Sequence, residues 1–596
     1  MSFGFSLLQD LDDAQKAVVE TLEGPVVIYA GAGSGKTRAL TYRIANGVLN
    51  KLFDPTKVLA LSFTTRAADE MALRLASLGI RNVATRTFHS AALRQLKYFW
   101  PIAIGGTMPI IIENKYKVLD AALKNKKLKI REVISEIEFA KTNRMDPESL
   151  SNLDFADAYQ DYINFTDKNN LIDFEDVLML LVAIFEDRPD LLSEVQQTFE
   201  FFSVDEYQDV NPLQQNLLDL WLGANENICV VGDIAQTIYS FAGAKAKYLE
   251  EFPHKYPNAA IFRLNRNYRS SFEIVDFANS LLAQMPSSKS SVGSLFPTRT
   301  KNEVVKIKSL SNDFEEAKMI TQEISQLLEN GVEPKNIAVL SRVNAQLELL
   351  ASQLESENIE FYMQTNERYS LKSRLEPKIT LASIHATKGL EWDHVFVLGV
   401  SDGYLPFIQA ETQDEINEEL RLLYVATTRA KENLYLSWAK SRDSDSGERI
   451  ISRFLNQKNK LNVATDETVY TTISRKNEIT KDLMRCKNCE KPLVSGSEVI
   501  LQRCKNCPSK LPSEYLLAAK KWRTEQAIIE NLPEFLIFSD ASLEAFVEAI
   551  FEVKSESEFL KIVGVDEVKF GKYFDELSTV LAQVEPEIEQ LHPVDK

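Results

Sequence analysis

The chain has 596 residues, 44% of them hydrophobic and 26% charged, with a formal net charge of -18. This composition excludes a disordered or fibrous protein, and at roughly 150 residues per domain the length predicts several folded domains. The acidic balance of the whole chain argues against a nucleic-acid partner, because Lys and Arg hold polyanions, but a local groove can still be basic.

No apolar run approaches the roughly 20 residues that span a bilayer. The first residues, MSFGFSLLQDLDDAQ, carry acids and lack the basic-then-apolar pattern of a signal peptide. We therefore expect a cytoplasmic protein without a membrane partner. The five cysteines fit that compartment.

The first predicted element is a phosphate-binding loop between a strand, VVIY, and a helix, RALTYRIA. The loop AGAGSGKT fits the pattern GxxxxGK[ST] except for Ala30 at its first position. In such loops, backbone N–H groups and the helix N-terminus favour phosphate, a lysine reaches the outer phosphates, and a hydroxyl binds Mg²⁺. The alternative is a glycine-rich turn with an incidental lysine. The predicted nucleotide contacts are Ala30, Gly31, Ala32, Gly33, Ser34, Gly35, Lys36 and Thr37.

An acidic pair is predicted to complete this site. The run FFSV predicts a buried parallel strand that ends at Asp205 and Glu206. Beside a phosphate loop, the first carboxylate and the Thr37 hydroxyl can hold Mg²⁺, and the second carboxylate can orient the attacking water. The alternative is an acidic surface turn.

These blocks belong to an ordered series along residues 5–457. The series reads LDDAQ, AGAGSGKT, LSFTTRAADEM, TRTFHS, VDEYQDVN, VVGDIAQTIYSFAGA, LNRNYRS, SIHATKGLEWDHVFV and EELRLLYVATTRAKE. In this order the blocks resemble superfamily-1 DNA helicases of the UvrD/Rep/PcrA type, a family that also tolerates alanine at the position of Ala30. The resemblance implies an α/β fold with two RecA-like P-loop motor domains, whose parallel sheets are flanked by helices, and ATP and Mg²⁺ as cofactors.

The resemblance also implies roles for single residues. Gln15 matches the residue that reads the adenine edge, and Glu391 the residue that contacts the ribose. Arg38 and Tyr268 match the pair that sandwiches the adenine ring. The groups that meet the γ-phosphate include two arginines, which would neutralise charge as the phosphoryl group leaves. Taken singly, each residue has an alternative role without function in the site, such as a surface ion pair. The implied catalytic set is Lys36, Asp205, Glu206, Gln236, Arg269 and Arg429.

Four rings match family positions that line single-stranded DNA, where flat rings stack on bases without reading sequence. They are Phe63, His89, Tyr239 and Phe241. The alternative is core packing, which is most plausible for Phe63 at the end of VLALSF. The chain departs from the family at Ile234 and Ala235, where acids are common, and at Ala242, where Arg is common. We therefore expect an altered contact between the ATP site and the DNA track.

The resemblance also predicts domain boundaries. The first motor domain covers 1–90 and 191–270, a helical accessory insertion covers 91–190, and the second motor domain covers 271–457. In relatives a second accessory domain interrupts the second motor, but here only residues 270–382 lie between Arg269 and Ser383. We expect that domain to be reduced or absent, and the restraint on unwinding that the family implies for it to be weak.

The first insertion contains a basic cluster, which either meets DNA phosphates or forms a solvated helical face. The cluster consists of Lys115, Lys117, Lys124, Lys126, Lys127, Lys129 and Arg131.

A polar linker is predicted over 458–482, followed by a small zinc ribbon over 483–512. Two CKNC segments bring Cys486, Cys489, Cys504 and Cys507 into the pattern of a structural Zn²⁺ site. The alternatives are two disulfides or an iron-sulfur cluster. Cys229, in NICVVGD, is interpreted as a core thiol.

Residues 513–590 resemble an HRDC domain, a small helical bundle at the end of some helicases. The matching residues are Trp522, Arg523, Pro533, Ser539, Asp540, Leu543 and Gly564, and one family glycine is replaced at Asp566. Such domains often assist DNA binding, but this one is rich in Glu, so protein docking or spacing is the alternative. With both a four-cysteine module and an HRDC-like domain, the chain resembles UvrD-like helicases of actinobacteria.

The sequence thus predicts an ATP-dependent DNA helicase that moves 3′ to 5′ on single-stranded DNA and unwinds tailed duplex DNA in repair or replication. The polarity is implied by the resemblance. The alternatives are a translocase that displaces proteins but unwinds weakly, and a non-catalytic DNA-binding scaffold. A protein partner could dock on the zinc ribbon or the HRDC-like end.

Overall fold

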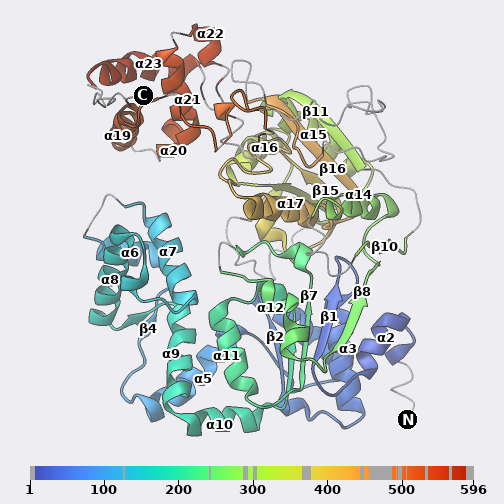
Figure 1. The fold of residues 1–596 in the computed structure, drawn as a ribbon. Helices are drawn as coiled ribbons and strands as arrows, with labels where there is room; N and C mark the ends of the chain where they lie inside the picture. Colours follow the sequence, from blue (N-terminus) through green and yellow to red (C-terminus); the bar gives the residue numbers. More distant parts are fainter. Residues whose placement is uncertain are drawn as a thin grey trace, which may run out of the picture. The chain divides into compact units, whose positions relative to one another are not determined.

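The computed structural model describes residues 7–124, 128–240, 243–285, 293–299, 305–364, 378–442, 449–455, 486–491, 493, 500–504, 506–509, 511–530, 534–552, 554–560, 562, 565 and 567–584. The chain forms two compact units, residues 1–270 with 285–300 and residues 271–284 with 301–596 (Figure 1). Across the described part of the chain, no helix is both long and apolar enough to cross a membrane.

The first unit is built on a parallel sheet in the order β3-β2-β6-β7-β1-β8. Strands β1, β2 and β7 are buried along their whole length, as expected of a parallel sheet covered by helices. The strands are β1 Val26–Ala30, β2 Val58–Ser62, β3 Ala84–Thr87, β6 Phe201–Val204, β7 Ile228–Gly232 and β8 Ala260–Leu264, with a short pair β9 Arg266–Asn267 and β10 Phe296–Pro297. The helices are α2 Asp13–Glu20, α3 Lys36–Leu49, α4 Thr65–Ser77, α11 Pro212–Leu222, α12 Lys247–Glu250 and α13 Phe252–Lys255.

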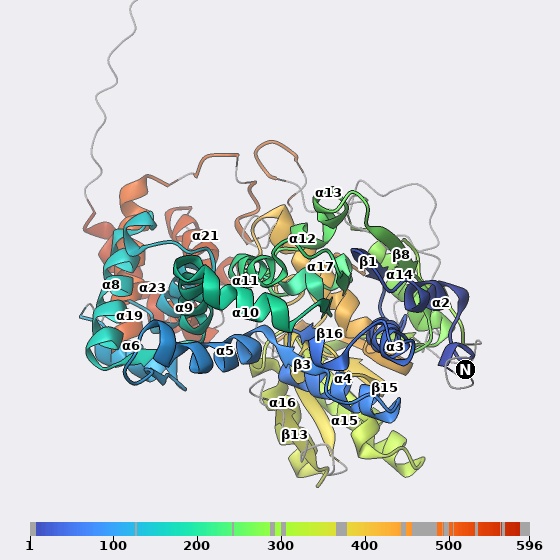
Figure 2. The same ribbon diagram turned by 90° about the horizontal axis from the view of Figure 1, so that it is seen from below.

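A helical insertion leaves this sheet after β3 and returns at β6, so that β2 pairs with β6 in the register Val58↔Phe201. The insertion has its own core, in which Leu119, Val133 and Tyr162 are fully buried. Helix α9 lies next to both α5 and α10 (Figure 2). The elements are α5 Phe88–Ala103, β4 Ile110–Ile111, α6 Lys115–Ala122, α7 Ile130–Thr142, α8 Leu153–Lys168, β5 Leu171–Ile172, α9 Phe174–Asp187 and α10 Pro189–Thr198.

The second unit contains another parallel sheet, in the order β11-β16-β15-β12-β14-β13. Its core joins Ile337 and Val339 of the sheet to Ile320 and Leu350 of two helices. The strands are β11 Val305–Asn312, β12 Ile337–Ser341, β13 Phe361–Gln364, β14 Ile379–Ser383, β15 Trp392–Val397 and β16 Ala430–Ser441. The helices are α14 Phe272–Leu282, α15 Asp313–Glu329, α16 Ala345–Ser356 and α17 Gln413–Thr427.

The C-terminal part combines cysteine-bearing turns with a helical bundle. Trp522, Phe538, Phe546 and Leu577 form the bundle core. The helices are α19 Ser513–Ile529, α20 Glu534–Ile537, α21 Asp540–Phe551, α22 Glu556–Phe559 and α23 Glu567–Ala582. Two parallel α/β sheets, a helical end and a cysteine cluster confirm the predicted fold class. The predicted linker, Pro533, Gly564 and Asp566 lie outside the described residues.

Candidate nucleotide-binding site

The loop between β1 and α3 adopts a backbone that needs glycine. Gly33 and Gly35 have φ angles of 67° and 81°, in the left-handed region that favours glycine. A Cβ added at Gly33 would lie 2.6 Å from Asn267 Nδ2 and 2.9 Å from Arg269 Cβ. The segment around Arg269 therefore packs directly against the loop.

We predict that Gly33→Ala lowers the Tm more than Gly79→Ala and raises the KM for ATP. Gly79 also has a positive φ, of 79°, but an added Cβ would meet nothing within 4 Å, so its replacement tests backbone strain alone. Thermal melting and steady-state ATP hydrolysis measure the two effects. Equal Tm losses would contradict the packing of Asn267 and Arg269 on the loop.

Lys36 opens helix α3 and points into a buried site. Its Nζ lies 3.6 Å from Glu206 Oε1, and its side chain is 10% exposed. The amine makes no hydrogen bond to the described residues. A buried ammonium carries three donors that need acceptors, so this side chain fits an anionic ligand such as a phosphate.

Thr37 and Asp205 meet beside Lys36. Thr37 Oγ1 donates a hydrogen bond of 2.7 Å to Asp205 Oδ2. Asp205 directly follows β6, and its backbone N–H is held 2.8 Å from the Leu61 carbonyl oxygen of β2. Burial, and then the neighbouring Glu206, raises the pKa of Asp205 to about 6, while Thr37 and Lys36 oppose the rise. A hydroxyl and a carboxylate oxygen form a donor set that suits Mg²⁺.

Glu206 is linked to Gln236 through two buried polar residues that the sequence analysis did not single out. Gln208 Nε2 donates to Glu206 Oε2 at 2.5 Å, and Gln208 Oε1 accepts from the Asp233 N–H at 3.0 Å. Gln236 Nε2 then donates to Asp233 Oδ2 at 2.7 Å. Glu206 has a φ of 53°, an uncommon conformation for a residue other than glycine. The sequence offered a signal for both linking residues, because Gln208 stands in the block VDEYQDVN and Asp233 in the block VVGDIAQTIYSFAGA.

Gln15 and Tyr268 contact the loop from two other elements. Gln15 Nε2 donates to the Ser34 carbonyl at 3.0 Å, and the Tyr268 N–H donates to the Gly33 carbonyl at 2.9 Å. The Arg38 guanidinium lies over the Tyr42 ring, 5.2 Å from its centre, and donates to the Asp10 carbonyl. The structure thus brings Gln15, Tyr268 and Arg269 to the loop that carries Lys36.

Arg429 and Glu391 belong to the second unit. Arg429 is 2% exposed, and its Nε and Nη1 donate to the Val425 and Leu390 carbonyls at 3.0 and 3.1 Å. Glu391, beside Leu390, pairs with Lys431 at 3.1 Å. These two predicted nucleotide contacts therefore lie close to each other.

Two of the rings predicted to meet DNA are stacked on each other. The Phe63 and Tyr239 ring centres are 5.1 Å apart with planes 24° apart, and Tyr239 is buried. His89 meets the Phe174 ring edge-on at 6.1 Å, and burial lowers the pKa of the imidazole. Phe241 lies outside the described residues, as does Ala242.

The basic cluster of the insertion is largely paired with carboxylates. Lys115 Nζ lies 2.9 Å from Glu138 and 2.7 Å from Glu175, and it also pairs with Asp173. Lys124 pairs with Asp161, and Lys129 lies 3.3 Å from Glu132. These contacts favour the reading as a charged helical surface, at least for these three lysines. Lys126 and Lys127 lie outside the described residues.

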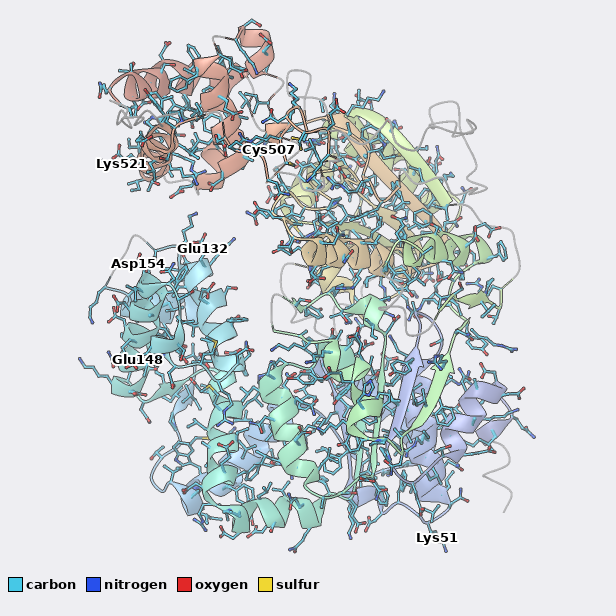
Figure 3. All side chains as sticks on the ribbon, in the orientation of Figure 1. Lys51, Glu132, Glu148, Asp154, Cys507 and Lys521 are labelled. Atoms are coloured by element: carbon cyan, nitrogen blue, oxygen red, sulfur yellow. The ribbon has the colours of Figure 1, made fainter. Side chains whose placement is uncertain are left out.

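Four thiols converge in the C-terminal part, where Cys507 precedes α19 (Figure 3). Their sulfur atoms all lie within 4.8 Å of one another, with separations of 3.7 Å for Cys486 and Cys507 and 3.4 Å for Cys489 and Cys504. Four thiolates about 2.3 Å from one Zn²⁺ would stand about 3.8 Å apart in a tetrahedron. All four are free cysteines, so the donor set fits a zinc ion.

Arg503, next to this cluster, joins it to the bundle. Its Nη1 lies 2.9 Å from Glu548, and its Nη2 pairs with Glu544, both on helix α21.

Comparison with known proteins agrees with this geometry. Residues 11–257 match the UvrD/REP helicase N-terminal domain, residues 262–373 and 363–441 match the UvrD-like helicase C-terminal domain, and residues 514–581 match the HRDC domain. The ATP-dependent DNA helicase UvrD2 of Mycobacterium tuberculosis (strain ATCC 25618 / H37Rv) is 31% identical over 691 aligned residues, covering 95% of this chain and 97% of the relative. The ATP-dependent DNA helicase PcrA of Bacillus subtilis (strain 168) is 33% identical over 366 residues, covering 58% of this chain and 49% of the relative.

Proposed function

The chain belongs to the UvrD/Rep helicase family and is an ATP-dependent DNA helicase, and we propose that it moves 3′ to 5′ along single-stranded DNA and unwinds tailed duplexes in repair or replication. The observation that carries the proposal is the buried group of Lys36, Thr37, Asp205 and Glu206 at the end of the first parallel sheet. Ligands of open α/β sheets bind at the carboxyl ends of the strands, where these residues stand.

The residues divide the work of phosphoryl transfer. When bound, Mg²⁺-ATP supplies the phosphoryl group that water attacks. Lys36 neutralises phosphate charge, and Thr37 and Asp205 offer the metal its oxygen ligands. Asp205 performs this task as the carboxylate. Glu206 accepts a hydrogen bond from the attacking water and so orients it.

The remaining predicted contacts complete the proposed site. Gln236 senses the terminal phosphate, and its chain of hydrogen bonds through Asp233 and Gln208 ties it to Glu206. Arg269 and Arg429 neutralise charge on the departing phosphate. Glu391 contacts the ribose, and Arg38 and Tyr268 enclose the base.

The DNA track is proposed along Phe63, His89, Tyr239 and Phe241. The stack of Phe63 on Tyr239 supports this, since a paired ring is rigid and can present its edge or a face to a base. Tyr239 follows Gln236 by three residues, so a change at the proposed phosphate sensor is close in sequence to the proposed strand-gripping ring.

A second candidate is a translocase that displaces proteins but unwinds weakly. The observation in its favour is that the described strands and α-helices from β11 to β14 belong to the second sheet and its flanking helices. This supports the proposal that the second accessory domain is reduced or absent.

We expect strand separation only from a 3′ single-stranded tail, because a motor that moves 3′ to 5′ can start on that tail and reach the duplex. The full chain is incubated with ATP, Mg²⁺ and matched duplexes carrying a 3′ or a 5′ tail, and displaced strand is counted. Separation from the 5′ tail would contradict the polarity. Strong DNA-stimulated hydrolysis without separation would favour the translocase, and no DNA-stimulated hydrolysis would favour a scaffold.

A further inference from the structure

Asp12 serves two distant parts of the nucleotide site with one carboxylate. Its Oδ1 accepts a hydrogen bond of 2.8 Å from the Gln15 N–H and so caps helix α2. Its Oδ2 accepts a hydrogen bond from the Tyr268 hydroxyl, although Tyr268 lies far along the chain, after β9. The same side chain therefore connects two of the residues that reach the phosphate loop from outside it.

The bonds around Gln15 fix the orientation of its amide. Gln15 Oε1 accepts from the Asp12 N–H at 3.4 Å, and Gln15 Nε2 donates to the Ser34 carbonyl at 3.0 Å. A glutamine amide has two N–H donors and two acceptor lone pairs, so one of each remains. The remaining N–H donor matches the N7 acceptor of adenine, and the remaining acceptor lone pair matches its N6 amino donor. Guanine offers two acceptors on the same edge and does not match.

Tyr268 needs a second support because it lies at the surface. Its backbone N–H is held by the Gly33 carbonyl at 2.9 Å, but the residue is 43% exposed, and its hydroxyl contacts Arg266 as well as Asp12. The bond to Asp12 fixes the far end of the ring. A ring held at both ends stacks on a base with less loss of side-chain entropy.

We propose that Asp12 is a positioning residue that selects adenine nucleotides by holding the first turn of α2, which carries Gln15, in register with the Tyr268 ring. The inference rests on the proposed function. Asp12 does not touch the reacting phosphates in this scheme. Its loss therefore changes the KM for ATP and the preference for ATP over GTP, and leaves kcat nearly unchanged.

Asp12→Ser separates the two tasks of the carboxylate. Serine caps a helix about as well as aspartate, but it is too short to reach the Tyr268 hydroxyl. Tyr268→Phe keeps the ring and removes the same bond, together with the contact of the hydroxyl with Arg266. We expect each variant to raise the KM for ATP about threefold to tenfold, the effect of one net hydrogen bond, and the double variant to do no more than either alone. Each should also lower the ratio of kcat/KM for ATP to that for GTP.

Two further variants serve as controls. Asp12→Asn can still accept from the Gln15 N–H and can donate to the Tyr268 hydroxyl, so it should restore most of the ATP preference. Asp54 caps another short helix through Thr56 at 2.9 Å, so Asp54→Ser should leave both constants unchanged.

The outcomes are distinct. A KM and a nucleotide preference of wild-type size in Asp12→Ser would overturn the inference, and so would effects of Asp12→Ser and Tyr268→Phe that add in the double variant. A full-length wild-type chain without DNA-stimulated ATP hydrolysis would instead contradict the proposed function.

Discussion

Replacing Lys36 with alanine is expected to reduce DNA-stimulated ATP hydrolysis by about a hundredfold or more, as loss of one preorganised charge contact does in other enzymes. The Lys36 ammonium is buried beside Glu206 and makes no hydrogen bond to the described residues. Without it, the phosphates would face two carboxylates and no lysine. Phosphate release with excess single-stranded DNA measures the loss.

Binding of single-stranded DNA should persist in the Lys36→Ala protein, because the proposed DNA contacts lie on other segments. Fluorescence anisotropy with a labelled oligonucleotide tests this. Lys57→Ala is a matched control. Lys57 pairs with Glu200 at 2.9 Å and directly precedes the N-terminal end of β2, whereas the phosphate site lies at the carboxyl ends of the strands. An exposed pair of this kind contributes little, so hydrolysis should stay at the wild-type rate. Hydrolysis by Lys36→Ala within a few fold of wild type would contradict the phosphate role.

The second large effect is expected at the cysteine cluster. The purified chain should carry about one zinc ion, and Cys504→Ser should carry almost none, because a neutral hydroxyl replaces one of four thiolates. Cys504 is buried at the centre of the cluster, with Cys489 and Cys507 at 3.4 and 3.6 Å. Atomic absorption gives the zinc content per chain.

Cys229→Ala is the matched control for thiol loss, since Cys229 is a buried thiol of strand β7 and is not one of the four clustered cysteines. Its zinc content should equal that of the wild type. Iron in place of zinc in the wild-type protein would support an iron-sulfur cluster. A full zinc content in Cys504→Ser would show that the metal binds elsewhere.

The resemblance implied the two-motor fold, and single strands could be predicted from the sequence because the central parallel strands are buried on both faces. Runs such as VVIY and FFSV are apolar along their length and became β1 and β6. The phosphate loop could be predicted for a local reason, since its glycines and Lys36 are consecutive. These predictions needed only neighbouring residues.

Contacts between distant segments were not predictable in this way. Gln208 and Asp233 look like ordinary polar residues until strands β6 and β7 bring them together. Lys115 looked free for phosphate, but Glu138 and Glu175 meet it from two other helices. The Phe63 and Tyr239 stack likewise joins the residue after β2 to the segment after η4 Ile234–Gln236, although β6 separates β2 from β7 in the sheet. The sequence blocks mark the segments that carry such residues, but a single sequence does not show which of their side chains pair.

The register of the first sheet also has a consequence for synthesis on the ribosome. Strands β1 and β2 emerge early, but β1 pairs with β7 and β8, and β2 pairs with β6 beyond the helical insertion. The insertion has its own core and can fold while these apolar strands still lack their partners. Long-range parallel pairing is slow, and unpaired strands are prone to aggregate. Nascent chains that pause within the insertion should therefore be the ones that depend most on chaperones.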